Sequence, residues 1–367
     1  MDIPERISLK VDLSVLASNI KAVRSQVAPL QLMAVVKADA YGVGVQPVAR
    51  IARDAGAAMF GVATLKEGLE IADLKLPIQL LSMILPEEIP LAVQHGFGIP
   101  ITGLAMAQSL SAEALRQQRP VYGQLVIDTG MGRAGILDDQ ALSEINAIVK
   151  LPNLVINGIY THFSCAGSRN DEYTLSQLEK FIAIRSQLAL PRTPLYVHCA
   201  ASDAIANYSK SCRQPFTMVR CGLMMYGMAP FGELPLRPVL TLETRLAAIR
   251  VLPAGRSVGY LRQYTTGKPT RVGLIPIGYA DGLPLGISNR GRVLVNDRYC
   301  PVIGRISMDY TTIDLSGVPE AAIGDRVVIF GRDQQRDIAL SELAHWGGNH
   351  DYQALCALGK RVQRIYC

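Results

Sequence analysis

Four residues that could do chemistry follow or lie within short apolar runs that are typical of buried strands. They are Lys37, His162, Ser202 and Arg220. Lys37 comes directly after Ala34-Val35-Val36. A charge at the end of a buried strand must be solvated, paired or converted chemically, and a Schiff base is one such conversion. Lys37 is therefore the first candidate for covalent chemistry, and the alternative is a surface lysine that only caps a strand.

The elements that must position these residues alternate in type. Eight apolar runs recur, mostly separated by helix-length stretches such as 64–72, 140–149 and 172–188. The runs cover 30–36, 59–63, 78–84, 98–101, 122–127, 156–161, 195–199 and 218–223. This alternation predicts an α/β fold, a (β/α)₈ TIM-type barrel, although a doubly wound open sheet has a similar pattern. A barrel places its active site at the carboxyl ends of its strands, where the four residues fall.

The composition and the hydrophobic pattern of the chain change after Tyr226. Proline and glycine fall close together at Pro230, Gly232, Pro235 and Pro238. Short alternating segments such as 240–249 and 327–330 then follow, bounded by further glycine and proline. We therefore expect a barrel domain over residues 1–237 and a mostly β C-terminal domain over 238–367. Ahead of the first run, Asp12 precedes an amphipathic stretch that predicts a capped helix.

Composition excludes several classes of protein. The 367 residues are 49% hydrophobic and carry a formal net charge of +6, spread without a basic block, which argues against a nucleic-acid surface. No apolar run reaches the length of a signal peptide at the N-terminus or of a membrane span elsewhere. The seven scattered cysteines include no CxxC pair. These features predict a cytoplasmic protein with reduced thiols, and we expect no metal.

The segments around these residues are similar to those of one known family. The run Ala34-Val35-Val36-Lys37-Ala38-Asp39-Ala40-Tyr41-Gly42 resembles the cofactor-lysine motif of alanine racemases. Further segments resemble the same family in the same order: 128–133, 161–163, 198–202, 219–227, 278–282, 304–309 and Tyr352. The resemblance covers nearly the whole chain and implies a pyridoxal 5'-phosphate barrel, a β domain, and a homodimer whose active sites draw on both subunits.

The resemblance also implies roles for residues around the cofactor. Lys37 would bind pyridoxal phosphate covalently, and Arg220 would face the pyridine nitrogen, which an always-protonated guanidinium leaves unprotonated. The phosphate would be held by residues of the loops after the last two barrel strands together with two hydroxyls. These are Ser202, Gly222, Leu223, Tyr41 and Tyr226. Without the family, Gly222 could be an ordinary turn glycine and Arg220 an ordinary ion-pair partner.

Racemisation needs proton removal on one face of Cα and delivery on the other, so two groups are required. By resemblance these are Lys37 and Tyr260, the latter from the partner subunit. A tyrosine of ordinary pKa, about 10, is a poor base, and His162, linked to Arg220, is the family's candidate for favouring the phenolate. The family positions for the substrate carboxylate and the entrance correspond to Arg133, Met308, Tyr352, Tyr279 and Asp309.

Three positions depart from the family pattern. Many alanine racemases carry a carbamylated lysine that holds the carboxylate-binding arginine, and this chain has Val126 there. We expect a bound anion such as chloride, or another side chain, to replace it beside Arg133. The usual histidine after the Ala-Tyr-Gly motif is Val43, and an Asn-Ser pair appears as Ala201-Ser202.

The sequence therefore predicts an alanine racemase that supplies D-alanine for peptidoglycan. A racemase of broader specificity, acting for example on serine, shares these motifs. A fold-related decarboxylase would oppose the pyridine nitrogen with a carboxylate, and Arg220 speaks against it. A non-catalytic pyridoxal-phosphate carrier would need Lys37 and the phosphate loops only, and a purely structural barrel would need neither.

Overall fold

The computed structural model describes residues 5–190, 195–228 and 234–367, so residues 1–4 and the linker positions Pro230 and Gly232 lie outside the described residues. The chain forms two compact units. The barrel unit comprises 15–40 and 45–237, and the β unit comprises 41–44, 238–367 and the chain up to Ser14. The domain limits 1–237 and 238–367 stay a prediction; the units divide after Arg237, and the N-terminal strand belongs to the β unit.

A closed ring of parallel strands forms the centre of the barrel unit. In the described chain eight strands take part: β2 (Gln31–Val35), β3 (Met59–Val62), β4 (Ile78–Leu80), β5 (Ile99–Ile101), β6 (Val121–Asp128), β8 (Leu154–Tyr160), β9 (Tyr196–His198) and β10 (Met218–Cys221). They pair in the orders β10-β2-β3-β4 and β5-β6-β8-β9, and the short β7 (Ile136–Leu137) pairs with β6. Each of the eight predicted runs overlaps one of these strands.

Backbone hydrogen bonds close the two arcs into a ring. Leu80 N–H donates to Gly98 C=O at 2.9 Å, which joins β4 to β5. Thr217 N–H donates to Val197 C=O at 2.9 Å, which joins β9 to β10. Closure excludes the doubly wound open sheet, and the predicted (β/α)₈ barrel is confirmed.

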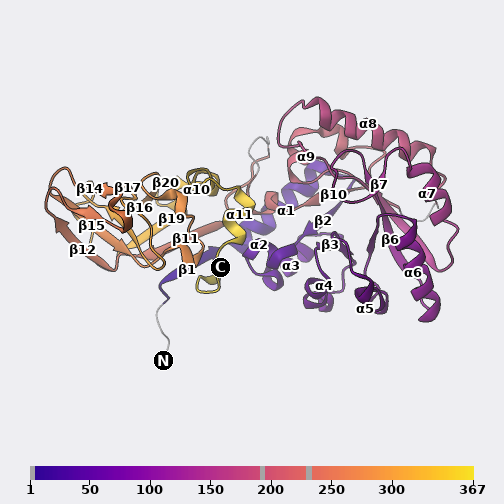
Figure 1. The fold of residues 1–367 in the computed structure, drawn as a ribbon, viewed down its shortest axis with the longest axis horizontal. Coiled ribbons are helices and arrows are strands. Elements are labelled where there is room, and N and C mark those ends of the chain that lie inside the picture. The colour runs from indigo at the N-terminus through magenta and orange to yellow at the C-terminus, as the bar shows by residue number, and fades with distance from the viewer. Residues whose placement is uncertain (1–4, 191–194, 229–233) are drawn as a thin grey trace. The chain divides into compact units, whose positions relative to one another are not determined.

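Helices follow the barrel strands and surround them (Figure 1). They are α1 (Leu13–Val27), α3 (Val45–Asp54), α4 (Leu65–Glu70), α5 (Ile89–His95), α6 (Leu104–Arg116), α7 (Ala141–Ile148), α8 (Glu172–Gln187) and α9 (Ser202–Asn207). Short 3₁₀ turns are η1 (Ala72–Leu74), η2 (Pro86–Glu88), η3 (Ser209–Cys212) and η4 (Leu223–Tyr226). The amphipathic prediction for α1 is confirmed, because Leu16, Ile20 and Val23 are buried.

Two barrel strands end at least two residues before their apolar runs do. The run 78–84 is a strand only to Leu80, and the run 218–223 only to Cys221, after which η4 begins. Apolar composition marks burial and does not separate a buried strand from a buried turn that follows it. Both shortened ends leave the chain free to turn at the carboxyl end of the barrel, where the candidate residues lie.

The β unit contains two main sheets. The larger pairs in the order β17-β16-β19-β11-β1-β21, with β20 beside β19, and the smaller in the order β12-β15-β18; β13 pairs with β14. Their bounds are β1 (Ile7–Val11), β11 (Leu240–Arg245), β12 (Ala248–Leu252), β13 (Ser257–Val258), β14 (Tyr264–Thr265), β15 (Thr270–Ile275), β16 (Arg292–Val295), β17 (Arg298–Pro301), β18 (Thr311–Asp314), β19 (Arg326–Asp333), β20 (Arg336–Ile338) and β21 (Gln363–Tyr366). Turns η5 (Tyr260–Arg262), η6 (Tyr279–Asp281) and η7 (Leu285–Ile287) and helices α10 (Leu340–Gly347) and α11 (Asp351–Cys356) complete it.

The predicted segment 240–249 is two strands and not one. β11 and β12 belong to different sheets. Between them the Leu246 N–H bonds to Asp325 and the Ala247 N–H bonds to Leu274, so the chain changes partners within two residues. The alternation of side chains continues through this exchange, which is why the sequence pattern did not reveal it.

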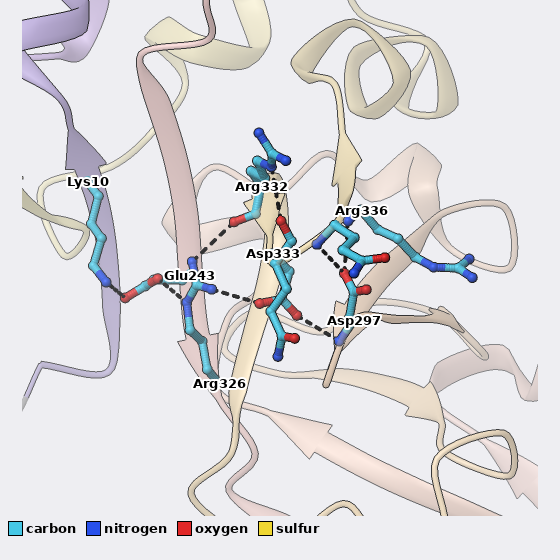
Figure 2. A network of polar contacts seen from close by, with 9 residues as sticks. Lys10, Glu243, Asp297, Arg326, Arg332, Asp333 and Arg336 are labelled. Carbon is cyan, nitrogen blue, oxygen red and sulfur yellow. Dashed lines mark hydrogen bonds and ion pairs between the residues drawn. The ribbon is translucent and has the colours of Figure 1, made fainter.

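A charged network links strands β1, β11 and β19 of the β unit with the turn between β16 and β17 (Figure 2). Glu243 on β11 pairs with Lys10 on β1 at 2.8 Å and with Arg326 on β19, whose Nη1 lies 2.9 Å from Asp333 Oδ1. Asp333 in turn accepts the Asp297 N–H at 2.9 Å. Burial raises the pKa of Glu243, but hydrogen bonds from Lys10 and Arg326 outweigh it and lower the pKa overall. The network therefore stabilises the pairing of these strands, and the charged groups of Lys10, Glu243, Arg326 and Asp333 each have a partner of opposite charge.

Within the described ranges, no helix is both long and apolar enough to cross a membrane. All seven cysteines of the sequence lie in these ranges, and none of them forms a disulfide bond.

Candidate active site

The carboxyl end of the barrel brings together the residues that the sequence singled out there. Lys37 follows β2, His162 follows β8, Ser202 begins α9 after β9, and Arg220 lies in β10. In a parallel barrel these strand ends meet at one rim. The barrel thus gathers an amine, an imidazole, a hydroxyl and a guanidinium from four separate parts of the sequence.

The chain directly after Lys37 forms a left-handed turn, α2 (Lys37–Gly42). The φ angles of Ala38, Asp39, Ala40 and Tyr41 are 53°, 53°, 54° and 63°. Left-handed backbone costs an L-residue about 1–2 kcal/mol, and such residues usually occur singly. A run of four without glycine stores strain beside the candidate lysine, and backbone strain of this kind clusters at functional sites.

Arg220 is buried, with 4% of its surface exposed, and its hydrogen-bond acceptors are all neutral. Its Nη1 lies 2.6 Å from His198 Nδ1 and its Nη2 lies 3.0 Å from His162 Nδ1. Nη2 also donates to the backbone oxygens of Thr161, at 3.0 Å, and Cys199, at 2.9 Å. Among the residues described, no ion pair includes Arg220. Burial lowers the pKa of Arg220, yet guanidinium stays protonated at any ordinary pH.

His198 and Gln124 form the inner end of this chain of contacts. His198 Nε2 lies 2.7 Å from Gln124 Oε1, and the ring stacks on Tyr160 with centroids 4.8 Å apart. Burial first, then the charge of Arg220, lowers the pKa of His198 well below its usual value. A neutral His198 that accepts from Arg220 at Nδ1 must carry its proton on Nε2 and donate it to Gln124. The guanidinium is thereby held in one orientation without losing its charge.

His162 is neutral for the same reasons. Burial, then Arg220, Arg133 and Lys37, lower its pKa to about 3. Its Nδ1 accepts from Arg220, so its proton lies on Nε2. Gln177 Nε2 holds the His162 carbonyl at 3.2 Å. His162, the predicted partner of the Tyr260 phenolate, therefore offers a hydrogen-bond donor and carries no positive charge.

Two short helical segments offer hydrogen-bond donors beside Ser202. α9 begins at Ser202 and η4 begins at Leu223, and the residue before each of them, Ala201 or Gly222, makes no side-chain cap hydrogen bond. Ser202 Oγ accepts the N–H of Gly222 at 3.1 Å and lies 3.4 Å from the N of Met224. The first N–H groups of a helical turn lack partners within the turn and suit an anion. The position of Ser202, Gly222 and Leu223 is thus suited to a phosphate.

Tyr226 lies against the left-handed turn that follows Lys37. It is buried, and its hydroxyl donates to the Ala40 carbonyl at 2.8 Å. That bond ties Tyr226 to the left-handed turn, and its role toward the phosphate stays a prediction.

The loop that carries Arg133 is organised by Asp128 at the end of β6. Asp128 Oδ1 accepts N–H groups from Gly130, Met131 and Gly132 at 2.9, 2.8 and 3.1 Å. Burial raises the pKa of Asp128, but these backbone donors and that of Arg133 outweigh it and lower the pKa overall. Val126 is buried on β6 and offers no group to hold the exposed Arg133 side chain. What replaces the missing anion stays a prediction.

The remaining candidates lie in the β unit. Tyr41 packs near Tyr352 with ring centroids 5.6 Å apart. Two loops carry Tyr279 and Met308, and the N–H of Tyr279 bonds to the Ser307 carbonyl at 3.1 Å. Arg361 joins these loops, because it pairs with the buried Asp281 and with Asp309, each at 2.9 Å. Within this unit, then, Tyr279 and Met308 lie on adjoining loops.

Tyr260 stands on an exposed and strained turn of the β unit. Its side chain is 69% exposed. Gly259, Leu261 and Arg262 around it all have positive φ, at 71°, 59° and 52°. A Cβ added to Gly259 would lie 2.9 Å from the backbone of Arg305, so glycine is required where these two loops meet. In a single chain, Tyr260 is presented to solvent.

Sequence reasoning assigned no role to Gln124, His198 or Glu67. A glutamine inside the apolar run 122–127 and a histidine ending the run 195–199 were signals of a buried polar network. The spacing of Thr64 and Glu67 is that of a capping box, which the structure contains. Its link to Ala38 could not be foreseen from sequence.

Two family models match this chain. The N-terminal domain of alanine racemase matches residues 11–230, and the C-terminal domain of alanine racemase matches residues 239–366. Among curated relatives, the alanine racemase of Desulforamulus reducens is 35% identical over 372 aligned residues, covering 99% of this chain and 99% of the relative.

Solved structures agree with these matches. The alanine racemase from D-cycloserine-producing Streptomyces lavendulae has a TM-score of 0.93 at 32% identity, covering 100% of this chain and 98% of the other. The alanine racemase from Bartonella henselae, with covalently bound pyridoxal phosphate, has a TM-score of 0.91 at 28% identity, covering 99% and 100%. The chain described here belongs to the alanine racemase family.

Proposed function

We propose that this chain interconverts L-alanine and D-alanine with pyridoxal 5'-phosphate as cofactor, using Lys37 on one face of Cα and Tyr260 of the partner subunit on the other. Family membership over nearly the whole chain and the lysine at the barrel rim support this proposal. We also propose a homodimer, a cytoplasmic location, and supply of D-alanine for peptidoglycan.

The residues at the rim fit the cofactor. Lys37 provides an amine, Arg220 provides a buried cation, and Ser202 with the first turns of α9 and η4 would provide donors for a phosphate. When bound, pyridoxal phosphate draws electrons from the Cα of the amino acid joined to it, which makes the α-proton removable.

The environment of Arg220 is the observation that favours racemisation over decarboxylation. Its neutral acceptors leave it a full positive charge, and guanidinium donates hydrogen bonds without giving up its proton. A pyridine nitrogen held against Arg220 would therefore stay unprotonated, and Arg220 would in this way limit how far charge spreads from Cα and favour return of the proton to Cα. A decarboxylase would be served by a carboxylate at this place, and no carboxylate of the described residues pairs with Arg220.

Proton transfer on two faces needs two groups. Lys37 can take or give the proton on one face. Tyr260 would serve the other, where a hydrogen bond from the Nε2–H of the neutral His162 and the nearby charge of Arg220 would favour the phenolate. This division explains how one site handles both enantiomers.

The exposure of Tyr260 supports an active site shared between subunits. A reactive tyrosine that is 69% exposed, and Met308 that is 52% exposed, are poorly placed to work in a single chain. Arg133 and Met308 would receive the substrate carboxylate, and Tyr279, Asp309 and Tyr352 would line the entrance. A second copy that covers these side chains would complete each site.

The assignment of the two bases has a direct test. Tyr260→Phe should strongly slow removal of the α-proton from L-alanine while leaving exchange of the D-alanine α-proton less affected. Isotope exchange into each enantiomer, followed by mass spectrometry, measures both rates. Equal loss in both directions with intact cofactor binding would overturn the assignment.

The shared site is tested by mixing two inactive variants. Lys37→Ala and Tyr260→Phe protein, mixed under conditions of subunit exchange, should regain about a quarter of the sites, because half of the dimers are mixed and each has one intact site. No recovery after confirmed exchange would place the whole site in one chain.

A further inference from the structure

Glu67 connects the first turn of α4 to the residue that follows the candidate cofactor lysine. Its Oε1 accepts the Ala38 N–H at 2.9 Å. Its Oε2 accepts the Ala63 N–H at 2.7 Å and that of Thr64 at 3.3 Å. One carboxylate thus receives three backbone donors from two segments. The capping box explains only the Thr64 contact.

Ala38 is the first residue of the left-handed turn, with φ of 53°. An alanine with exposed surface has nothing in its own side chain to favour that conformation. The turn must therefore be held by contacts from outside it. Tyr226 holds its middle through the Ala40 carbonyl, and Asp39 Oδ1 holds its far end through the Val45 N–H at 2.7 Å. Glu67 holds its beginning, next to Lys37.

We propose that Glu67 is a positioning residue for Lys37, because its carboxylate holds Ala38 in the left-handed conformation and so fixes the backbone from which the lysine side chain leaves. A hydrogen bond to a charged acceptor is stronger than a neutral one. Loss of this bond lets Ala38 relax toward negative φ, which turns Lys37 away from the position suited to the cofactor. The inference rests on the proposed function of Lys37.

The chain offers two matched controls. Thr64 supplies the other half of the same capping box, because its Oγ1 accepts the Glu67 N–H at 3.2 Å, and no described bond of its side chain reaches Ala38. Glu88 makes the equivalent carboxylate contact in η2, where it accepts the Leu85 N–H at 2.8 Å. Thr64→Ala therefore weakens the α4 cap alone, and Glu88→Gln removes a similar carboxylate elsewhere.

The experiment measures binding of pyridoxal phosphate to protein first freed of cofactor, by absorbance titration, and borohydride-trapped adduct on Lys37 by mass spectrometry. Glu67→Gln, of the same size, should raise the Kd about tenfold, in line with loss of a charge-assisted hydrogen bond. Amide exchange at residues 38–42 should become faster. Thr64→Ala and Glu88→Gln should leave Kd within about twofold of wild type.

Two results would overturn the inference, and only the second of them is also a failure of the proposed function. If Glu67→Gln matches Thr64→Ala in Kd and in amide exchange, Glu67 only caps α4. If wild-type protein forms no adduct on Lys37, the proposed function fails and this inference with it. If Glu67→Gln folds poorly, Glu67→Asp replaces it in the test. Glu67→Asp keeps the charge but has a shorter side chain, and it should likewise raise the Kd and speed amide exchange at residues 38–42.

Discussion

Two arginines, one in each unit, are held in opposite ways. Arg220 in the barrel unit is 4% exposed and its acceptors are two neutral imidazoles and two carbonyl oxygens. Arg326 in the β unit is 38% exposed and pairs with the carboxylates of Glu243 and Asp333 (Figure 2). A cation that is neutralised by carboxylates stabilises strand pairing. A buried cation that has no carboxylate partner can instead interact electrostatically with a bound ligand.

This contrast separates a cation that serves a reaction from one that serves the fold. Burying an unneutralised charge is costly, and the barrel unit tolerates it by surrounding Arg220 with neutral acceptors. Burial first, and then the same charge, lowers the pKa of both adjacent histidines. A stable protein alone would gain more from a carboxylate at this place, so the arrangement points to function.

The largest expected effect comes from removing the buried charge of Arg220 in the barrel unit. Arg220→Met keeps length but removes the charge, and kcat/KM for L-alanine should fall by at least about a hundredfold, comparable to loss of a key electrostatic donor. Arg326→Met, the matched change in the β unit, should leave kcat/KM of folded protein within about threefold of wild type. Steady-state kinetics in both directions measure kcat/KM. Similar losses of kcat/KM in the two variants would contradict a catalytic role for Arg220 that Arg326 does not share.

The second effect concerns pH. The folded pKa of His162, about 3, lies below the ordinary value of 6.5, and that of His198 is also lowered. Below pH 6.5 the unfolded chain binds protons that the folded chain does not, so stability is full above 6.5 and is lost as the pH falls. Well below 6.5 the free energy of unfolding should drop by about 1.4 kcal/mol per pH unit for each histidine.

Urea denaturation between pH 7 and pH 5 measures this slope, because the lowered carboxyl pKa values act only at lower pH. His162→Gln, which keeps an acceptor for Arg220, should lose about half of the slope. A wild-type stability that stays constant over this range would mean that the folded histidines accept protons.

A smaller effect is expected from Glu243. Glu243→Gln leaves Lys10 and Arg326 with one carboxylate fewer and should lower the free energy of unfolding by about 1–2 kcal/mol, since the site is only partly buried. Glu320→Gln is the control, because Glu320 pairs with Arg298 at 3.8 Å and both side chains are about half exposed. It should change stability by less than about 0.5 kcal/mol. Equal shifts in the urea midpoint would contradict a role for burial.

The smallest effect should come from Arg361, which is 53% exposed and lies between Asp281 and Asp309. Arg361→Gln loosens the loops that carry Tyr279 and Met308, so KM for alanine should rise about threefold with kcat nearly unchanged, as an exposed ion pair contributes little. Arg361→Lys should recover most of the loss. A fall in kcat without a change in KM would show that the loops do more than receive substrate.

The sequence by itself determined the barrel and the chemistry at its rim. Eight apolar runs predicted eight strands, because a strand buried on both faces must be apolar throughout. Lys37, His162, Ser202 and Arg220 could be placed at strand ends for the same reason. The family resemblance added the reaction, since motifs of this specificity fix residue types in order along nearly the whole chain.

Only the tertiary structure decided the charge states, hydrogen-bond partners and backbone conformations of these groups. No local pattern shows that Arg220 has neutral acceptors, that His162 is neutral, or that Glu67 holds Ala38, because each contact joins residues far apart in the chain. The split of 240–249 into two sheets and the left-handed turn after Lys37 likewise depend on distant partners. Hydrophobic periodicity encodes which residues are buried, whereas charge states and strained backbone are set by what folding brings beside them.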